Sequence, residues 1–261
     1  MLELHQEGPV ARLRIRRAEK KNALNEPLWR ALLGHLQALE VAARARAPQA
    51  ARVLLLQGEG GAFCAGADIE EMAQLMRTPG AMLANMQLID AAQRTLENLP
   101  LPTLAVIDGP CFGGGFGLAA ACDMRLASTR SLFAITPSRL GLLYSLNDTR
   151  RLVRLVGDAR ARRLLLRGER IDADTAAQWG VLHAVLDPAA LDAAAQALAE
   201  ELAGQSRGSM AGIKAMLAAV SSSPDAPTPE ALHAQFVAAF ESEDFAEGSA
   251  AFLGKRAARF P

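Results

Sequence analysis

Two glycine-rich turns constrain the fold of this chain more than any other feature of its sequence. They span residues 60–69 and 109–117, and each follows a short apolar run and precedes a helical pattern. Two strand-to-helix turns of this kind can direct their main-chain N–H groups at one point, which suits an oxygen atom that gains negative charge. One such turn alone would indicate only close packing of a helix on a sheet. The pair therefore predicts a site built mainly from backbone.

The hydrophobic pattern predicts strands that alternate with helices. Residues 2–7 and 10–15 alternate apolar and polar side chains across Gly8-Pro9, which indicates an antiparallel hairpin. This alternation of strands and helices in the first two thirds of the chain is typical of an α/β fold. Further strands are expected at residues 53–56, 104–107, 124–127, 132–135 and 181–185, and helices at 25–43, from 69, and at 85–99, 115–121, 148–156, 158–166, 172–179, 191–203 and 209–220.

The last part of the chain has a different character. A linker-like segment, residues 221–229, precedes two amphipathic helices at 229–240 and 244–252. Such helices pack on a core or on a neighbouring subunit more often than they fold alone. We therefore divide the chain into a core, residues 1–200, and a C-terminal helical region, residues 201–261.

The bulk composition excludes several classes of protein. The 261 residues are 51% hydrophobic and 21% charged, which is typical of a soluble globular protein. The formal net charge is zero, so a nucleic-acid partner is not expected. No apolar run approaches the length of about 18 residues that a membrane span needs, and the N-terminus shows no signal-peptide pattern. These features favour a cytoplasmic protein with neither a nucleic-acid nor a membrane partner.

Single reactive side chains give weaker signals than the two turns. The three cysteines, Cys64, Cys111 and Cys122, form no CxxC pair, which argues against a disulfide scaffold or a zinc site. The four histidines lie far apart without metal-ligand spacing, so no metal site is expected. Ser206 lies in a GxSxG pattern, but a nucleophile of that kind follows a strand, and here a helical pattern precedes it.

Several segments together resemble the crotonase superfamily, also called the enoyl-CoA hydratase/isomerase family. Residues 20–25 resemble its N-terminal signature, 61–72 its first oxyanion-hole loop and 109–123 its second. The resemblance covers nearly the whole chain. It implies a crotonase-like spiral of ββα turns, followed by helices that form a homotrimer or a dimer of trimers. The segments 140–142, 168–173, 179–182 and 251–256 follow in the family's order.

The resemblance also implies an acyl-CoA thioester as the ligand, with no cofactor beyond its CoA moiety. The thioester oxygen would lie between the backbone N–H groups of Ala67 and Gly114. Proton removal or carbon–carbon cleavage beside a thioester produces an enolate, and two fixed donors stabilise its oxygen. Asp68 is expected to close its turn and cap a helix. The residues implied to bind the CoA moiety are Lys20, Lys21, Ala65, Asp68, Ile69, Phe252 and Lys255.

The chain departs from the family at two positions where hydratases use glutamates. Gly117 and Pro137 stand there, and because neither side chain transfers a proton, efficient hydration by that mechanism is not expected. Residues 136–144 resemble methylmalonyl-CoA decarboxylase. Tyr144, the only tyrosine of the chain, could donate to a substrate carboxylate or relay a proton. Asp148 is a candidate base, although its place before an arginine-rich helix favours an N-cap.

Three functions remain open. The chain could be an enzyme that acts on an acyl-CoA through an enolate, as an isomerase, a decarboxylase or a degenerate hydratase. It could bind CoA thioesters without turnover, since both glutamate positions are vacant. A structural or RNA-binding role has the least support, because the net charge is zero. Candidates to line an apolar acyl pocket, or to belong to the core, are Met72, Leu75, Met76, Leu83, Met86 and Phe116.

Overall fold

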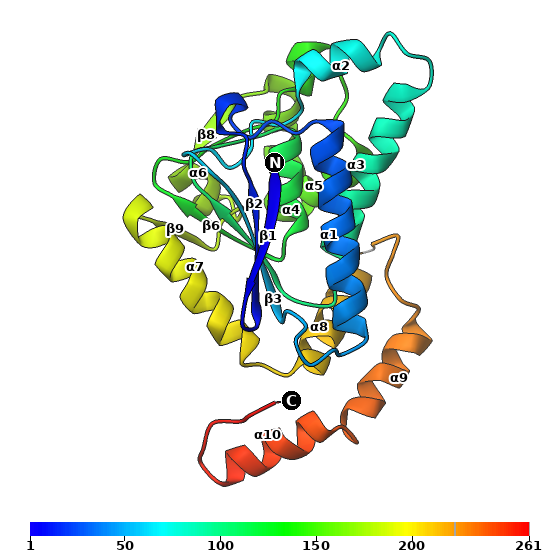
Figure 1. Cartoon of the computed structure of the whole chain (residues 1–261), viewed down its shortest axis with the longest axis vertical. Helices are drawn as coiled ribbons and strands as arrows, with labels where there is room; N and C mark the ends of the chain where they lie inside the picture. The colour runs from blue at the N-terminus through cyan, green and yellow to red at the C-terminus, as the bar shows by residue number, and fades with distance from the viewer. Residues whose placement is uncertain (222, 261) are drawn as a thin grey trace.

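A computed structural model describes residues 1–221 and 223–260 of the chain. The first two strands, β1 (Leu2–Glu7) and β2 (Val10–Ile15), form the predicted hairpin, in which Leu2 lies opposite Ile15. Beyond β2 the main sheet is parallel, with the order β1-β2-β3-β4-β6-β9 (Figure 1). The other strands of this sheet are β3 (Val53–Gly58), β4 (Thr103–Ile107), β6 (Met124–Ser128) and β9 (Ala184–Leu186).

The middle of the main sheet, at β3 and β4, is buried on both faces. In β3, Leu54 and Leu56 pack in the same hydrophobic cluster as α1 (Glu26–Arg44), whereas Val53 and Leu55 pack with α7 (Pro188–Ala203) on the opposite face. Successive side chains of a strand point to opposite faces, so a parallel strand buried on both sides is continuously apolar. This explains the unbroken run Val53-Leu54-Leu55-Leu56.

A second, three-stranded sheet carries the second glycine turn. Its strands are β5 (Pro110–Phe112), β7 (Leu132–Ala134) and β8 (Arg170–Asp172), in the order β5-β7-β8. The sequence does not predict β5, which lies inside the second glycine turn, or β8, which directly precedes α6. Helix α4 (Gly114–Ala121) leaves β5 directly. The strands and helices alternate as expected for an α/β fold.

Most helices lie where the sequence predicts them, and their ends follow local capping. Asn25 caps α1 by accepting a hydrogen bond from the Leu28 N–H. Gly157 interrupts α5 (Leu146–Arg167) with a φ of 76°, at the break between the two helices predicted there. The remaining helical segments are η1 (Ala18–Lys20), α2 (Ile69–Leu75), α3 (Ala81–Glu97), η2 (Pro137–Leu140), α6 (Ala173–Gln178) and α8 (Arg207–Val220).

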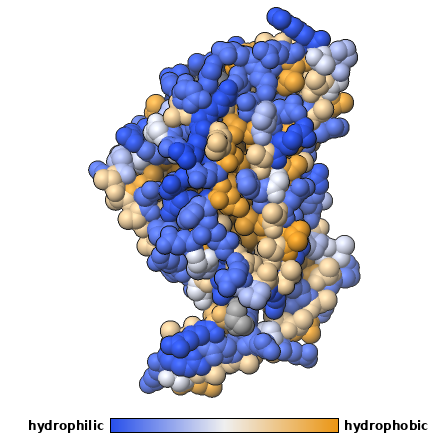
Figure 2. All heavy atoms as spheres, viewed as in Figure 1, coloured by the Kyte–Doolittle hydropathy of each residue, from blue (hydrophilic) through white to orange (hydrophobic). Residues whose placement is uncertain are grey.

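Two C-terminal helices form an arm that stands away from the body. These are α9 (Pro229–Ala239) and α10 (Glu243–Leu253), at the opposite end of the molecule from α2 (Figure 1). Helix α8 belongs to the body, since Lys214 Nζ binds the Asp123 carboxylate at 2.6 Å and the Leu101 carbonyl at 2.9 Å. The surface is largely hydrophilic, with a hydrophobic band along the middle of the face in view (Figure 2). Among the described residues, no helix is both long and apolar enough to cross a bilayer.

Candidate functional site

The two glycine turns lie against each other. Phe112 N donates to Cys64 O at 2.9 Å and Cys64 N to Pro110 O at 3.0 Å, so the turns pair like short strands. On its other side the first turn is fixed to residues before α1, since Leu24 N donates to Gly66 O at 2.7 Å. The first turn is therefore hydrogen-bonded on both sides.

Glycine is required where the turns touch. A Cβ atom on Gly115 would lie 2.4 Å from the Cys64 carbonyl oxygen, which is backbone and cannot rotate away. Gly66 has a φ of 98°, and a Cβ atom there would lie 2.9 Å from Phe112 O. The close approach explains the glycines that the sequence shows in both turns.

The contact leaves two main-chain N–H groups, those of Ala67 and Gly114, without an acceptor among residues 1–221 and 223–260. Gly114 is the first residue of α4, and a Cβ atom on it would lie 3.9 Å from Ala67 N. The two donors thus lie close together, and one of them is at the positive end of a helix dipole. Such an arrangement can bind a single oxygen atom that carries negative charge.

Tyr144 lies beside the second turn. Its hydroxyl donates to the Gly113 carbonyl at 3.2 Å, and the side chain is half-buried against the core. Burial, together with the nearby Asp148 carboxylate, raises the pKa of Tyr144 well above its usual range. The phenol is therefore neutral at physiological pH, so it can donate or accept a hydrogen bond but is not a phenolate base.

Asp148 lies at the site, but it does not cap its helix as expected. The N-cap of α5 is Ser145, whose Oγ accepts from Asp148 N at 3.0 Å. The Asp148 side chain instead turns inward, where it accepts from Ser145 Oγ at 2.8 Å and from Arg151 Nη1 at 3.1 Å. Serine three residues before an acidic residue is the capping-box pattern, and it explains why Ser145 takes the cap.

The Asp148 carboxylate lies against Gly117. A Cβ atom on Gly117 would be only 2.5 Å from Asp148 Oδ1, so this carboxylate occupies the space that a side chain at position 117 would enter. Burial raises the pKa of Asp148, and the Arg151 charge and the Ser145 hydroxyl partly oppose that rise. A carboxyl group therefore stands beside α4 although residue 117 is glycine.

Sequence reasoning missed Gln93. This residue of α3 is 1% exposed, and a Cβ atom on Gly117 would lie 2.6 Å from its Nε2. Its Oε1 accepts from Arg151 Nη1 at 3.3 Å, and Arg151 in turn donates to Glu97 at 2.7 Å through Nη2. The available signal was its place in the buried stripe of α3 with Ala92 and Leu96, where a polar residue needs a partner.

The residues that the resemblance assigns to CoA near the first turn do lie together there. Lys21 O accepts from Ala65 N at 2.9 Å, and Lys20 forms an exposed ion pair with Glu70 at 2.9 Å. Asp68 caps α2 as expected and binds Arg17 at 2.7 Å. Burial alone would raise the pKa of Asp68, but the hydrogen bonds from Arg17 and the α2 amides lower it. The side chain of Ile69 is exposed.

The other two residues assigned to CoA, Phe252 and Lys255, lie elsewhere. Phe252 belongs to α10 and Lys255 follows it, so both are in the arm at the opposite end of the same chain from α2 (Figure 1). Within one chain the structure does not bring them to the two turns. Phe252 is 84% exposed.

The apolar pocket candidates lie in different environments. Met76, Leu83 and Met86 are exposed on and between α2 and α3. Phe116 is buried in the core, edge-on to Phe133 with 6.3 Å between the ring centroids. These candidates therefore divide between the surface and the core.

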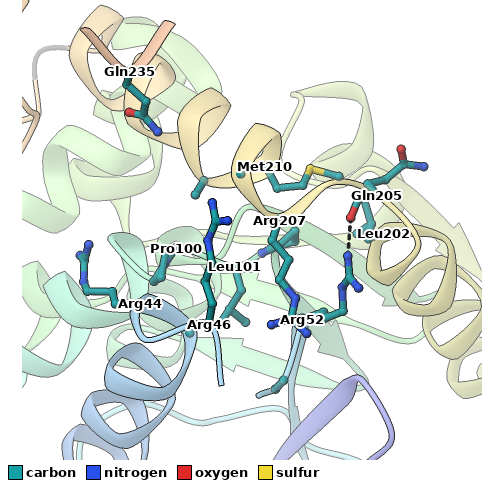
Figure 3. Close-up of a pocket in the computed structure, with 15 residues that line it drawn as sticks. Arg44, Arg46, Arg52, Pro100, Leu101, Leu202, Gln205, Arg207, Met210 and Gln235 are labelled. Atoms are coloured by element: carbon teal, nitrogen blue, oxygen red, sulfur yellow. Dashed lines mark hydrogen bonds between the residues drawn. The ribbon is translucent and has the colours of Figure 1, made fainter. Parts of the chain in front are cut away.

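Two cavities of the described chain lie away from the glycine turns. One, of about 290 Å³, is lined by Arg44, Arg46, Arg52 and Arg207 with Pro100 and Leu101 (Figure 3). In it Arg52 donates to the Gln205 carbonyl at 2.8 Å, which holds the turn before α8 (Figure 3). The other, of about 1090 Å³, lies between α8, α9 and α10.

Other chemistries find little support in the described residues. They contain no group of histidine, cysteine and carboxylate side chains that could hold a metal ion. Burial raises the pKa of Cys64 and of Cys122 to about 12, so neither is a thiolate at neutral pH. Ser206 is the N-cap of α8. It therefore lies in a turn that precedes a helix and does not follow a strand, which agrees with the helical pattern predicted before it.

Comparison with known proteins identifies the family. The model of the enoyl-CoA hydratase/isomerase family matches residues 5–261. The chain is 31% identical to the 1,2-epoxyphenylacetyl-CoA isomerase of Escherichia coli, over 98% of this chain and 96% of that one. It is 33% identical to human mitochondrial enoyl-CoA hydratase domain-containing protein 2, over 91% and 83% of the two chains.

A solved structure agrees with this result. An enoyl-CoA hydratase/carnithine racemase from Magnetospirillum magneticum superposes with a TM-score of 0.91 at 31% identity, and the match covers 100% of this chain and 95% of the other. The likeness thus extends from the sequence to the complete fold. The chain belongs to the enoyl-CoA hydratase/isomerase family, the crotonase superfamily, and is an enzyme of that family.

Proposed function

We propose that this enzyme acts on an acyl-CoA thioester and stabilises an enolate at the two glycine turns. The observation that carries the proposal is the pair of unpaired N–H groups of Ala67 and Gly114, which suits one anionic oxygen. Removing one donor of such a pair typically costs about 2.7–4 kcal/mol of activation free energy in other enzymes. Because both donors are main-chain groups, side-chain substitution leaves them in place.

Asp148 is the group we assign to proton transfer. Its carboxylate would remove a proton from the α carbon of the acyl group, and the electron pair of the C–H bond would move onto the thioester oxygen. Return of that proton to another carbon of the conjugated system would give an isomer. A carboxyl whose pKa is raised by burial is a stronger base once it is ionised. Tyr144, which stays neutral, would hold the second turn by donating its single hydroxyl proton to the Gly113 carbonyl.

The glycine at 117 and the proline at 137 set this enzyme apart from a two-glutamate hydratase. Isomerisation needs one base that returns its proton, and the site offers one carboxyl, Asp148, beside Gly117. Two of the known relatives are named as an isomerase and as a hydratase-domain protein, which agrees with a family that supports both reactions. Decarboxylation through Tyr144 and binding without turnover are the alternatives that the experiment must separate.

The arm suggests how the CoA moiety would be covered. Phe252 and Lys255 can contact CoA only if the arm of one copy reaches the turns of another, because both lie far from the turns of their own chain. Such an exchange would fit a homotrimer or a dimer of trimers, and it would bury the apolar side chains of α9 and α10. We therefore propose an oligomer in which each site is completed by a second copy.

Exchange of the α proton with solvent deuterium tests the function. Purified protein is incubated in D2O with butyryl-CoA, 3-hexenoyl-CoA, crotonyl-CoA and methylmalonyl-CoA, and products are followed by mass spectrometry. Exchange on butyryl-CoA and isomerisation of 3-hexenoyl-CoA are expected. Loss of CO2 from methylmalonyl-CoA without α exchange would favour the decarboxylase. Tight binding with no exchange on any thioester would contradict the enzyme proposal, and absence of binding would contradict the ligand class.

A further inference from the structure

An arginine-lined cavity lies at the end of the main sheet opposite the glycine turns. Its volume is about 290 Å³, and it lies where α1 ends, where β3 begins and where α8 begins (Figure 3). Arg52 directly precedes β3, whereas the first turn follows Gly58 at the other end of this strand. A strand of this length spans about 20 Å. The cavity is therefore separate from the proposed acyl-CoA site at the turns of the same chain.

Three of the four arginines that line the cavity have no carboxylate partner among residues 1–221 and 223–260. Arg52 and Arg207 donate only to main-chain carbonyl oxygens, and the guanidinium of Arg46 makes no hydrogen bond within those residues. A carbonyl oxygen accepts a hydrogen bond but does not neutralise a positive charge. The fourth, Arg44, forms an ion pair with Glu40 at 2.8 Å. The cavity thus faces three positive charges without a matching negative charge.

These charges oppose one another. Burial lowers the pKa of Arg52, and the positive charge of Arg207 lowers it further, while the Asp244 carboxylate acts in the other direction. Asp244 accepts from the Ser206 hydroxyl and forms no ion pair with the arginines of the cavity in the part of the chain that the structure describes. An anion bound in the cavity would offset the repulsion that remains.

Arg46 occupies a backbone position that favours glycine. Its φ is 50°, and it follows Ala45, the C-cap of α1. Helices commonly end with glycine at this left-handed position, because other side chains are strained there. The local backbone therefore does not explain the arginine. Its Nη2 lies 3.5 Å from the point where a Cβ atom on Gly208 would be, so the side chain reaches across the cavity to the first turn of α8.

A phosphate group matches these arginines better than a carboxylate does. A guanidinium binds phosphate through two parallel hydrogen bonds, and a dianion can offset more than one positive charge. Apolar side chains complete part of the lining, namely Pro100, Leu101, Leu202 and Met210. They offer a surface for a small organic group that carries the phosphate.

We propose that Arg46, Arg52 and Arg207 form a second ligand site, which binds the phosphate group of a small phosphorylated compound. Phosphate oxygens would accept from the Nη groups of Arg46 and Arg207. Arg52 would contribute its charge while it keeps its two carbonyl contacts. The site does not depend on the proposed function, because it lies at the other end of the strands and needs no thioester.

A carboxylate of the protein itself is the competing counter-ion, either from the arm or from a second copy. In that case the arginines would already be neutralised, and added phosphate would have no effect. Arg46→Gln and Arg207→Gln each remove one charge and keep most of the side chain. Arg14→Gln is the matched control, because Arg14 is an exposed residue of β2 outside the cavity.

The test is thermal denaturation with added phosphate, phenyl phosphate or acetate, with the ionic strength held constant by chloride. A ligand that binds the native state raises Tm, and saturating phosphate should raise Tm of the unsubstituted protein by about 2–5 °C. Acetate should have little effect. The rise with phosphate should be lost in Arg46→Gln and Arg207→Gln and persist in Arg14→Gln. A larger rise with phenyl phosphate would support a phosphate ester as the ligand, and an equal rise would support free phosphate.

A rise with phosphate no larger than that with acetate, or an equal rise in all four proteins, would overturn the inference, because the effect would then come from salt in general. A changed mass of Arg46→Gln in sedimentation velocity, without any response of the unsubstituted protein to phosphate, would also overturn it and assign the arginines to a contact between copies. The comparison of phosphate with acetate on the unsubstituted protein tests the inference even where an arginine variant does not fold. Deuterium exchange at the turns tests the proposed function separately.

Discussion

The two ends of the molecule differ in how closely they are packed. At one end the glycine turns are pressed so closely together that the Cys64 carbonyl leaves no room for a Cβ atom on Gly115. At the other end, α9 and α10 expose large apolar side chains, among them Phe240 at 57% and Leu253 at 81%. The hydrogen bonds that join the two turns lie within one chain, whereas the arm exposes apolar surface that another molecule could cover.

Main-chain groups dominate the first region, whereas exposed side chains dominate the second. The two turns approach each other so closely that a Cβ atom on Gly66 or Gly115 would collide with the backbone of the other turn. The large apolar side chains of the arm are exposed, so substituting them should change the free energy of unfolding only slightly. Three substitutions and one pH titration test this contrast.

Asp148→Asn should have the largest effect, on catalysis at the closed end. An asparagine keeps the size of the side chain but cannot take a proton, so the rate of α-proton exchange should fall by about 10²–10⁴-fold. Deuterium incorporation into butyryl-CoA measures the rate. Asp158→Asn, at an exposed position later in α5, should leave it unchanged. Equal rates in the unsubstituted protein and in Asp148→Asn would remove Asp148 from the mechanism.

Gly115→Ala should have the next largest effect, on stability. The added methyl would meet the Cys64 backbone at 2.4 Å, and overpacking of this kind costs about 1–3 kcal/mol, or more where backbone must move. Urea denaturation measures the free energy of unfolding. Gly34→Ala is the control, since nothing lies within 4 Å of its added Cβ in the exposed part of α1. That change should stabilise the protein by about 0.5–1 kcal/mol. Similar values for the two variants would show that the turns are not tightly packed.

The exchange rate and the free energy of unfolding should both depend on pH through the ionisation of Asp148, with a smaller effect than the two substitutions above. Because burial raises its folded pKa, the exchange rate should increase with pH around a midpoint above the ordinary aspartate value of about 3.9. The same shift means that the stability linked to Asp148 is present below its unfolded pKa and is lost as pH rises through the folded pKa. Asp148→Asn should remove this dependence from urea denaturation curves. A midpoint at or below the ordinary value would contradict the assignment.

Phe252→Ser should have the smallest effect on the single chain. The side chain is 84% exposed, and surface substitutions usually change the free energy of unfolding by no more than about 0.5 kcal/mol. The oligomer should nevertheless dissociate or weaken, which sedimentation velocity measures. Val41→Ser, at an exposed position of α1, serves as the control and should leave the mass unchanged. An unaltered mass for Phe252→Ser would show that the arm does not join subunits at this residue.

Much of the architecture could be read from local patterns. The alternation across Gly8-Pro9 predicts the hairpin, and the apolar run of β3 follows from burial on two faces. Asn25 and Asp68 cap their helices as expected, because capping depends on side chains a few residues away. The two turns were predicted to act together, and the structure brings them into contact.

The side chains around Gly117 could not be predicted in the same way. The sequence offers Asp148 as a candidate base and favours it as an N-cap, but Ser145 takes the cap and the carboxylate turns inward. Gln93 shows no motif at all, and only the packing of α3 against α4 and α5 brings it to the same point. These contacts join segments that are distant along the chain, so no local period records them.

The family, the order of strands and helices and the two turns follow from local sequence, because glycine, capping residues and hydrophobic periods act over short stretches of chain. Only the tertiary structure decided which polar groups share the space beside Gly117 and that the arm lies far from the turns of its own chain. Burial and close approach arise from the packing of whole helices and strands. This packing, and not the neighbouring residues in the sequence, decides where a residue such as Gln93 lies.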